Sequence, residues 1–129
     1  MPDGPIRIGR VASVRLAPNE DLVRGLQRAA DDLGFSHAIV RSGLGSLIDA
    51  AFAAPSGAPP RLVRGPAVEL VSLVGEISAD GADLGGVVGD PAGSVHAGHF
   101  LAGHNPVLVT VEAIMEEILP NPSPPASCA

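Results

Sequence analysis

Residues 18–34 read PNEDLVRGLQRAADDLG, and this stretch predicts the one main helix of the protein. Asn19 is a suitable N-cap, and Glu20 and Asp21 would then lie in the first turn, where the helix dipole favours negative charge. Gly34 follows the last apolar position, as a C-cap residue does. The apolar positions recur at helical spacing and are Leu22, Leu26, Ala29 and Leu33. We therefore expect an amphipathic helix that begins and ends inside this stretch.

The rest of the folded chain is expected to consist of strands, marked by alternation or by unbroken apolar runs. They are residues 6–16 before the helix and 37–41, 47–54, 68–77, 81–88, 95–101 and 107–115 after it. Residues 47–54 could also form a helix, but their alternation favours a strand. Glycine and proline place the connections at 42–46, 55–60 and 89–93. One early helix followed by a run of strands predicts the α+β class, with a mostly antiparallel sheet.

The strand at 68–77 is apolar on both of its faces. Leu70 and Val71 have opposite parity, and so do Leu73 and Val74. A strand of this composition is covered on both sides. Because a small domain with one helix cannot easily cover both faces of its sheet, we expect another element or a second subunit on the outer side.

Length and composition indicate one domain, residues 1–118, followed by a tail at 119–129. The tail is rich in proline, has little to bury and is expected to be disordered. It contains the single cysteine, Cys128, which excludes an intrachain disulfide and which we interpret as a solvated thiol.

The formal net charge is −6, and all eight basic residues are arginines scattered along the chain. Direct nucleic-acid binding is disfavoured because it depends on clustered positive charge, and because no Tyr or Trp offers a stacking surface. No apolar run reaches the length of about 18 residues that a membrane span needs. Residues 1–5 do not have the pattern of a signal peptide, so a cytoplasmic location is expected.

Several short motifs, in this order and spacing, resemble the plant-and-prokaryote-conserved (PPC) domain family. They span about residues 7 to 118 and are Glu20-Asp21-Leu22, Gly34-Phe35, Ser42-Gly43-Leu44-Gly45-Ser46, Gly65-Pro66, residues 69–77, Gly93, Gly98-His99 and Val111-Glu112. The resemblance implies a compact α+β fold, related to that of α-acetolactate decarboxylase, that usually assembles as a homotrimer. Plant members carry a separate AT-hook that contacts DNA. This sequence has no such Arg-Gly-Arg-Pro core.

The resemblance also implies a zinc site, because many members carry a His-x-His pair and a later Gly-Gly-His. Aligned through His99, the His-x-His positions fall on Asp83 and Gly85, so one imidazole has become a carboxylate and the other is missing. The candidate metal ligands are Asp83, His99 and His104, with zinc as the metal. His96 and His99 are three residues apart, so on a strand they would point to opposite faces. The alternative is that these histidines are structural or solvated.

Glu69 and Glu112 each lie in an apolar strand and form the second candidate site. A buried carboxylate has a raised pKa and can act as a general acid or base. On an open sheet face the same residues would be solvated, and at a subunit interface they could meet an arginine such as Arg41. The glycine-rich residues 42–46 could instead cradle an anion, but a tight turn is the favoured interpretation.

Three hypotheses for function follow from these observations. We favour a non-enzymatic homotrimeric assembly or interaction domain. The first alternative is a metal-dependent lyase or hydrolase with ligands Asp83 and His99 and with Glu112 as acid or base. The second is weak, sequence-nonspecific DNA association, which the provisional DNA-binding name of stand-alone family members suggests and the negative charge opposes.

Overall fold

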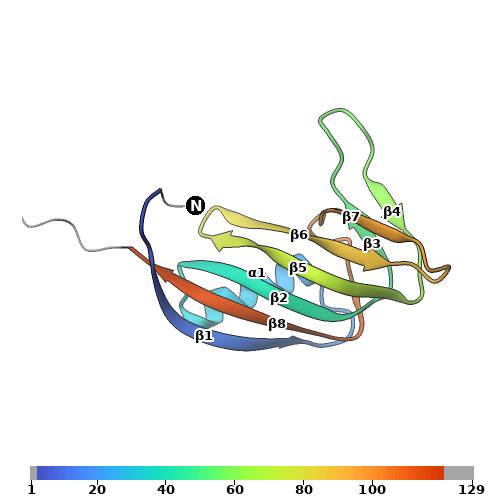
Figure 1. Ribbon diagram of the computed structural model, residues 1–129. Helices are drawn as coiled ribbons and strands as arrows, with labels where there is room; N and C mark the ends of the chain where they lie inside the picture. Colours follow the sequence, from blue (N-terminus) through green and yellow to red (C-terminus); the bar gives the residue numbers. More distant parts are fainter. Residues whose placement is uncertain (1–2, 121–129) are drawn as a thin grey trace, which may run out of the picture.

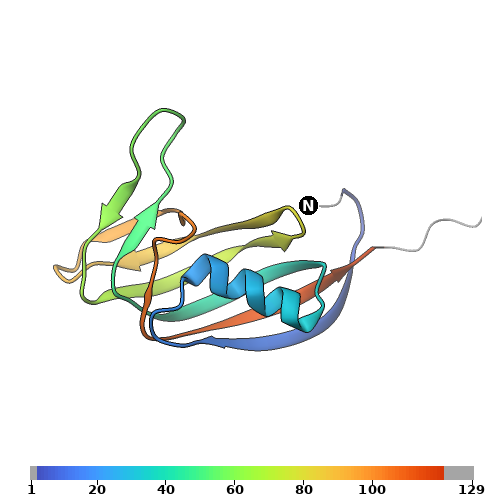
Figure 2. The same ribbon diagram turned by 180° about the vertical axis from the view of Figure 1, so that it is seen from behind.

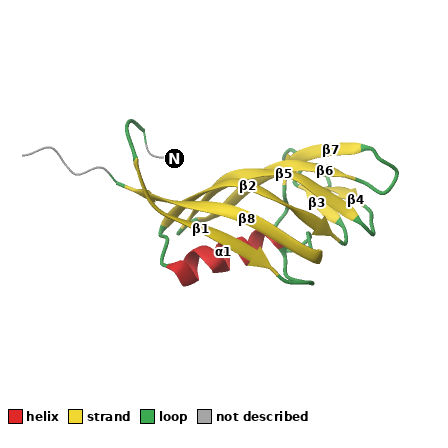
Figure 3. Ribbon diagram, turned by 60° about the horizontal axis from the view of Figure 1, so that its bottom comes forward, coloured by secondary structure: helices red, strands yellow, loops and turns green. Residues whose placement is uncertain are grey.

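The computed structural model describes residues 3–120, which form a six-stranded antiparallel sheet with one helix packed on one face (Figures 1 to 3). The elements are β1 Arg7–Leu16, α1 Leu22–Leu33, β2 His37–Leu47, β3 Ala50–Phe52, β4 Arg61–Val63, β5 Val68–Ser78, β6 Gly81–Gly89, β7 Val95–His99 and β8 Val107–Leu119. The strand order is β1-β8-β2-β5-β6-β7, and β3 and β4 pair separately. The predicted α+β class and the antiparallel sheet are confirmed.

Helix α1 lies along one face of the sheet, which we call the inner face (Figure 2). Its apolar residues pack on alternate residues of the strands, because side chains along a strand alternate between the two faces. The fully buried centre includes Leu22, Leu26, Val40, Leu73 and Met115. The opposite side of the sheet, which we call the outer face, is covered by no helix or strand of residues 3–120 in the view of Figure 3.

The helix begins two residues later than the sequence predicted. Asn19 has a left-handed φ of 70° and lies before the helix, and the N-cap is Asp21, whose carboxylate accepts from the backbone N–H groups of Val23 and Arg24. Asn19 is held elsewhere, since its own N–H donates to the carbonyl of Val107. The predicted C-cap is confirmed, because Gly34 adopts a left-handed φ of 76°.

Asp21 also fixes the loop between β7 and β8. Its carboxylate accepts from the N–H groups of Gly103 and Asn105, both at 2.9 Å. The Asn105 side chain, which is fully buried, accepts from the N–H of Ala51 at 2.7 Å and donates to the carbonyl of Leu101 at 2.7 Å. These bonds tie the helix start, the loop and β3 together, and one of them gives the N–H of buried Ala51 its acceptor.

The predicted turn at residues 42–46 is wrong, because β2 runs straight through these residues. Gly43 and Gly45 are needed for packing, not for a turn. A Cβ at Gly43 would lie 2.7 Å from Leu73 Cδ2, and one at Gly45 would overlap the carbonyl oxygen of Thr110. The glycines therefore allow the neighbouring strands to approach β2 closely, and the pairing of β2 with β8 shifts register on both sides of this stretch.

The remaining strand predictions agree with the structure. β1, the β6–β7 hairpin and the long last strand are present, and within the segment expected as a strand at 47–54, β3 occupies Ala50–Phe52. β8 extends to Leu119, one residue beyond the expected domain boundary. Residues 121–129 of the expected tail, with Cys128, lie outside the described residues. In the described part of the chain, α1 is far too short to cross a membrane and no other helix could do so.

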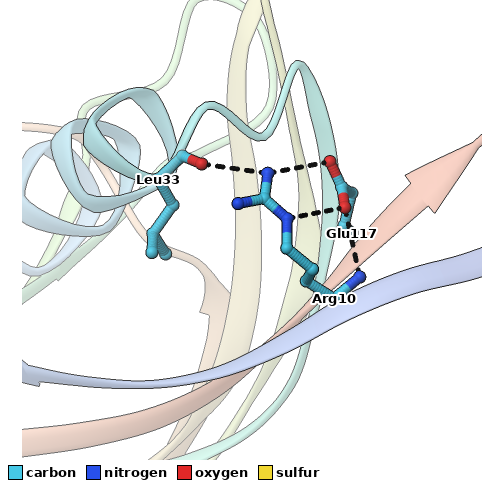
Figure 4. A network of polar contacts seen from close by, with 3 residues as sticks. All are labelled: Arg10, Leu33 and Glu117. Atoms are coloured by element: carbon cyan, nitrogen blue, oxygen red, sulfur yellow. Dashed lines mark hydrogen bonds and ion pairs between the residues drawn. The ribbon is translucent and has the colours of Figure 1, made fainter.

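Arg10 of β1 joins the end of the helix to Glu117 of β8, the strand that pairs with β1 (Figure 4). Arg10 donates to both carboxylate oxygens of Glu117, at 3.2 and 3.3 Å, and to the carbonyl of Leu33 at 3.1 Å. Its guanidinium carbon also lies 4.8 Å from the centre of the Phe35 ring. A cation at this place is favoured by the negative end of the helix dipole.

The Arg10–Glu117 contact predicts a loss of stability in acid. The hydrogen bonds from the Arg10 guanidinium lower the pKa of Glu117 below its ordinary value. A carboxylate whose folded pKa is depressed contributes stability above its unfolded pKa of about 4.3 and loses that contribution as the pH falls through the folded value. Melting temperatures measured from pH 6 to pH 3 should therefore fall, and Glu117→Gln should make the fall shallower.

Arg10→Gln should flatten the same curve, because the low pKa of Glu117 depends on the guanidinium. Part of the acid sensitivity should remain in both variants, since His37 lowers the pKa of Glu76 and His96 lowers that of Asp90. An unchanged slope in Glu117→Gln would show that this contact does not couple folding to pH.

Candidate functional site

The outer face carries large apolar side chains that are open to solvent in the single chain. They lie on neighbouring strands, and their exposed fractions are Val11 59%, Leu44 64%, Val71 61%, Val74 52%, Val109 65% and Ile114 37%. Single exposed apolar residues are common on proteins, but a contiguous group of this kind marks an interaction surface.

The strand register shows why these side chains share one face. Leu44 of β2 lies opposite Glu112 of β8, and Glu112 lies opposite Arg15 of β1. Gly43 and Ala113 form the next row, which is buried on the inner face. Alternation therefore sends the row of Leu44 outward. The same face holds a shallow groove of about 350 Å³, with walls that include Leu44, Val71, Val74 and Ile114 and polar groups from Ser13, Ser42 and Arg41.

Charges of both signs border this apolar centre. Arg15 lies 3.9 Å from Glu112, and Arg41 lies 3.7 Å from Glu116. Both arginines are more than 60% exposed, so these contacts contribute little to the stability of the chain itself. Glu69 faces the same side next to Ser46 and is exposed. The border therefore offers both donors and acceptors to a neighbouring molecule.

Glu69 and Glu112 are not buried, as the acid or base considered in the sequence would be. Each is exposed, and the Glu112 side chain retains 55% of its accessible surface. In the described chain these residues are solvated groups of the outer face, which is the alternative that the sequence left open.

The strand at 68–77 was expected to be covered on both faces, but within the single chain only its inner face is covered. Leu70 and Leu73 are buried in the core, each at 1% exposure, whereas Val71 and Val74 are exposed on the outer face. Cover of the outer side by a second subunit stays a prediction.

The candidate metal ligands are only partly brought together. Asp83 on β6 and His99 on β7 meet, with 2.8 Å between Asp83 Oδ1 and His99 Nδ1. His104 lies in the loop after β7 and is exposed, and among residues 3–120 no three His, Cys, Asp or Glu side chains gather as a metal site would require. His96 pairs with Asp90 at 2.8 Å, on the buried side of β7 opposite Val88. The predicted divergence of His96 and His99 is confirmed.

Two outer-face residues were missed in the sequence. Leu44 falls in the stretch expected as a turn, and Ile114 lies in the expected last strand without an assigned face. Their signal was present in the strand pairing, because Ile114 lies opposite Ser42 and Leu44 opposite Glu112, two neighbouring outward rows. The sequence does not indicate this pairing, because residues 42–46 have the composition of a turn and belong to β2 only in the structure.

The fold and the outer face together define a small α+β protein, one helix on an antiparallel sheet whose second face is open. A family model for the Plants and Prokaryotes Conserved (PCC) domain matches residues 5–119, so the chain belongs to this family. The resemblance seen in the sequence is thereby confirmed. No curated protein matches the chain.

Solved structures support the same fold. A hypothetical protein from Salmonella enterica aligns with a TM-score of 0.78 and 24% identity, over 89% of this chain and 81% of that one. A PPC protein from Pyrococcus horikoshii gives 0.75 and 23%, over 94% and 87%. A metal-containing protein from Archaeoglobus fulgidus gives 0.74 and 21%, over 92% and 86%. At these identities the likeness concerns the fold, and the relation to α-acetolactate decarboxylase stays a prediction.

Proposed function

We propose that this protein is a homotrimeric assembly domain whose copies associate through the outer face. The observation that carries the proposal is the group of exposed apolar side chains on β2, β5 and β8, centred on Leu44, Val71 and Val74. Burial of such surface is the main driving force of protein association. By the resemblance described above, members of the family usually form trimers.

A second copy of the chain can pack on this face because the face carries both positive and negative side chains. Arg15 and Arg41 share it with Glu69, Glu112 and Glu116, so a rotated copy can place its arginines against the carboxylates of the next. A closed ring built from one repeated contact satisfies every copy equally. The role of such a trimer is to present three identical subunits to a protein partner, which raises avidity without a new contact.

The other two functions are less well supported. The outer face mixes both charge signs, and three copies at −6 each would carry −18, which opposes binding to a polyanion such as DNA. A metal-dependent reaction would need about three side chains that bind the metal together, and among residues 3–120 no three His, Cys, Asp or Glu side chains gather in this way.

The oligomeric state tests the proposal. Light scattering after gel filtration at micromolar concentration should give three times the chain mass of 12.9 kDa, which is about 39 kDa. The double variant Val71→Asp with Val74→Asp should run as a folded monomer, because both side chains are exposed in the single chain and buried charge would oppose association. We expect the dissociation constant to rise at least about 100-fold.

Leu62→Asp is the matched control, since Leu62 is 56% exposed but lies on β4, outside the six-stranded sheet. It should leave the trimer unchanged. A monomeric wild-type protein, or a double variant that keeps the full trimer mass, would refute assembly through this face.

A further inference from the structure

Three positions on the outer side of β6 and β7 converge on one point. Gly85 lies directly opposite His99 in the β6–β7 pairing, and Asp83 comes two residues earlier on the same side of β6. The Asp83 carboxylate and the His99 imidazole already meet at 2.8 Å, and both side chains are more than 70% exposed. The point is therefore open to solvent and to an ion.

Gly85 leaves a place for a side chain at this point. The atom nearest to a Cβ built on Gly85 is the carbonyl oxygen of Gly98 at 3.3 Å, a close contact that needs a shift of a few tenths of an ångström, and His99 Nδ1 lies 4.0 Å away. The backbone φ of Gly85 is outside the left-handed region, so an ordinary residue can adopt it. A longer side chain at position 85 would face the imidazole.

The residues present do not fit a zinc site. A catalytic zinc takes about three protein ligands and keeps one open position. Here Asp83 and His99 are available, but their short contact means that Asp83 can equally act as the carboxylate that orients the imidazole, which leaves His99 alone as ligand. In the described chain no further His, Cys, Asp or Glu completes the group.

We infer that Gly85 is the residue that decides metal binding at this point: the wild-type chain does not retain zinc there, and a ligating side chain at position 85 would create the site. Asp83, a histidine at position 85 and His99 would then supply three donors from two hydrogen-bonded strands. The inference concerns donors within one chain and does not rest on the trimer.

Zinc content tests the inference directly. Wild type, Gly85→Ala, Gly85→His and the double variant Gly85→His with His99→Ala are loaded with zinc sulfate, passed through gel filtration and analysed for metal. We expect about one zinc per chain in Gly85→His and negligible zinc in the other three. Calorimetric titration should show at least about 100-fold tighter zinc binding by Gly85→His than by wild type. Zinc should also raise the melting temperature of that variant alone.

Gly85→Ala shows whether the strand accepts a Cβ at this position. If Gly85→His does not fold, Gly85→Cys provides a smaller ligating side chain, and it too is expected to retain about one zinc per chain. Two results would overturn the inference. One is a wild-type protein that retains zinc and loses it in His99→Ala, which would mean that a third ligand comes from elsewhere. The other is a folded Gly85→His or Gly85→Cys protein that binds zinc no better than wild type.

Discussion

Replacing Gly45 by alanine should destabilise the protein by at least about 3 kcal/mol, a large effect for a single methyl group. Gly45 has a φ of 150°, a conformation that side chains other than hydrogen rarely adopt. A Cβ there would also overlap the carbonyl oxygen of Thr110 and lie 2.8 Å from Val111 Cα. Both obstacles are backbone atoms of β8, so they cannot move aside as a flexible side chain would.

Gly89→Ala is the matched control for this substitution. Gly89 also lies in a strand, but a Cβ built on it meets no heavy atom within 4 Å and its φ is not left-handed. Its replacement should change the free energy of unfolding by less than about 1 kcal/mol and could stabilise by restricting the unfolded chain. Urea unfolding of both variants beside wild type makes the comparison. Equal stability of the two variants would contradict the close packing of β8 on β2.

Asn105→Ala should lower the free energy of unfolding by about 3 kcal/mol and the melting temperature by about 10 °C. The side chain of Asn105 is fully buried, accepts a hydrogen bond from the N–H of Ala51 and donates one to the carbonyl of Leu101. Truncation leaves the N–H of buried Ala51 without its acceptor, which costs about 1–3 kcal/mol, and it removes one of two hydrogen bonds to the carbonyl of Leu101, which also accepts from the N–H of His104. Thermal unfolding followed by circular dichroism measures the loss.

Ser94→Ala is the control, because Ser94 is exposed in the β6–β7 turn and bonds to Asp90 through its backbone N–H and carbonyl, which the substitution keeps. A second test uses Asp21→Ala. Asp21 and Asn105 hold the same loop, since the Asp21 carboxylate accepts from the backbone N–H of Asn105 at 2.9 Å. The double variant should therefore lose less stability than the two single losses added together. Strict additivity would show that the loop is not held as one unit.

The sequence predicted those parts of the fold that depend on neighbours along the chain. The helix with its apolar stripe and its Gly34 cap, the alternating first and last strands, and the β6–β7 hairpin all appear where the local pattern placed them. Hydrophobic periodicity and turn chemistry act over a few residues, and so they can be read without tertiary contacts.

Errors arose where a distant segment decides the local structure. Asp21, not Asn19, caps the helix because its carboxylate also binds the loop at Gly103 and Asn105, more than 80 residues away. Residues 42–46 read as a turn, since glycine is common in turns, but here glycine makes room for β8. No local pattern distinguishes these two uses of glycine.

The candidate site divides in the same way. Family spacing placed Asp83 next to His99, and the β6–β7 pairing brings them to 2.8 Å. His104 lies in the loop after β7, away from that point, and the β6–β7 register leaves Gly85 facing the imidazole. Whether Glu112 was buried or solvated depended on which face the helix covers, and that depends on the packing of the whole sheet.

By itself, then, the sequence determined the α+β class, the family and an overall negative charge, because composition, periodicity and motif order are properties of the chain alone. The tertiary structure decided that Leu44, Val71 and Val74 form one exposed surface. These residues lie on different strands, and only strand register and the position of α1 place them together on the uncovered face of the sheet.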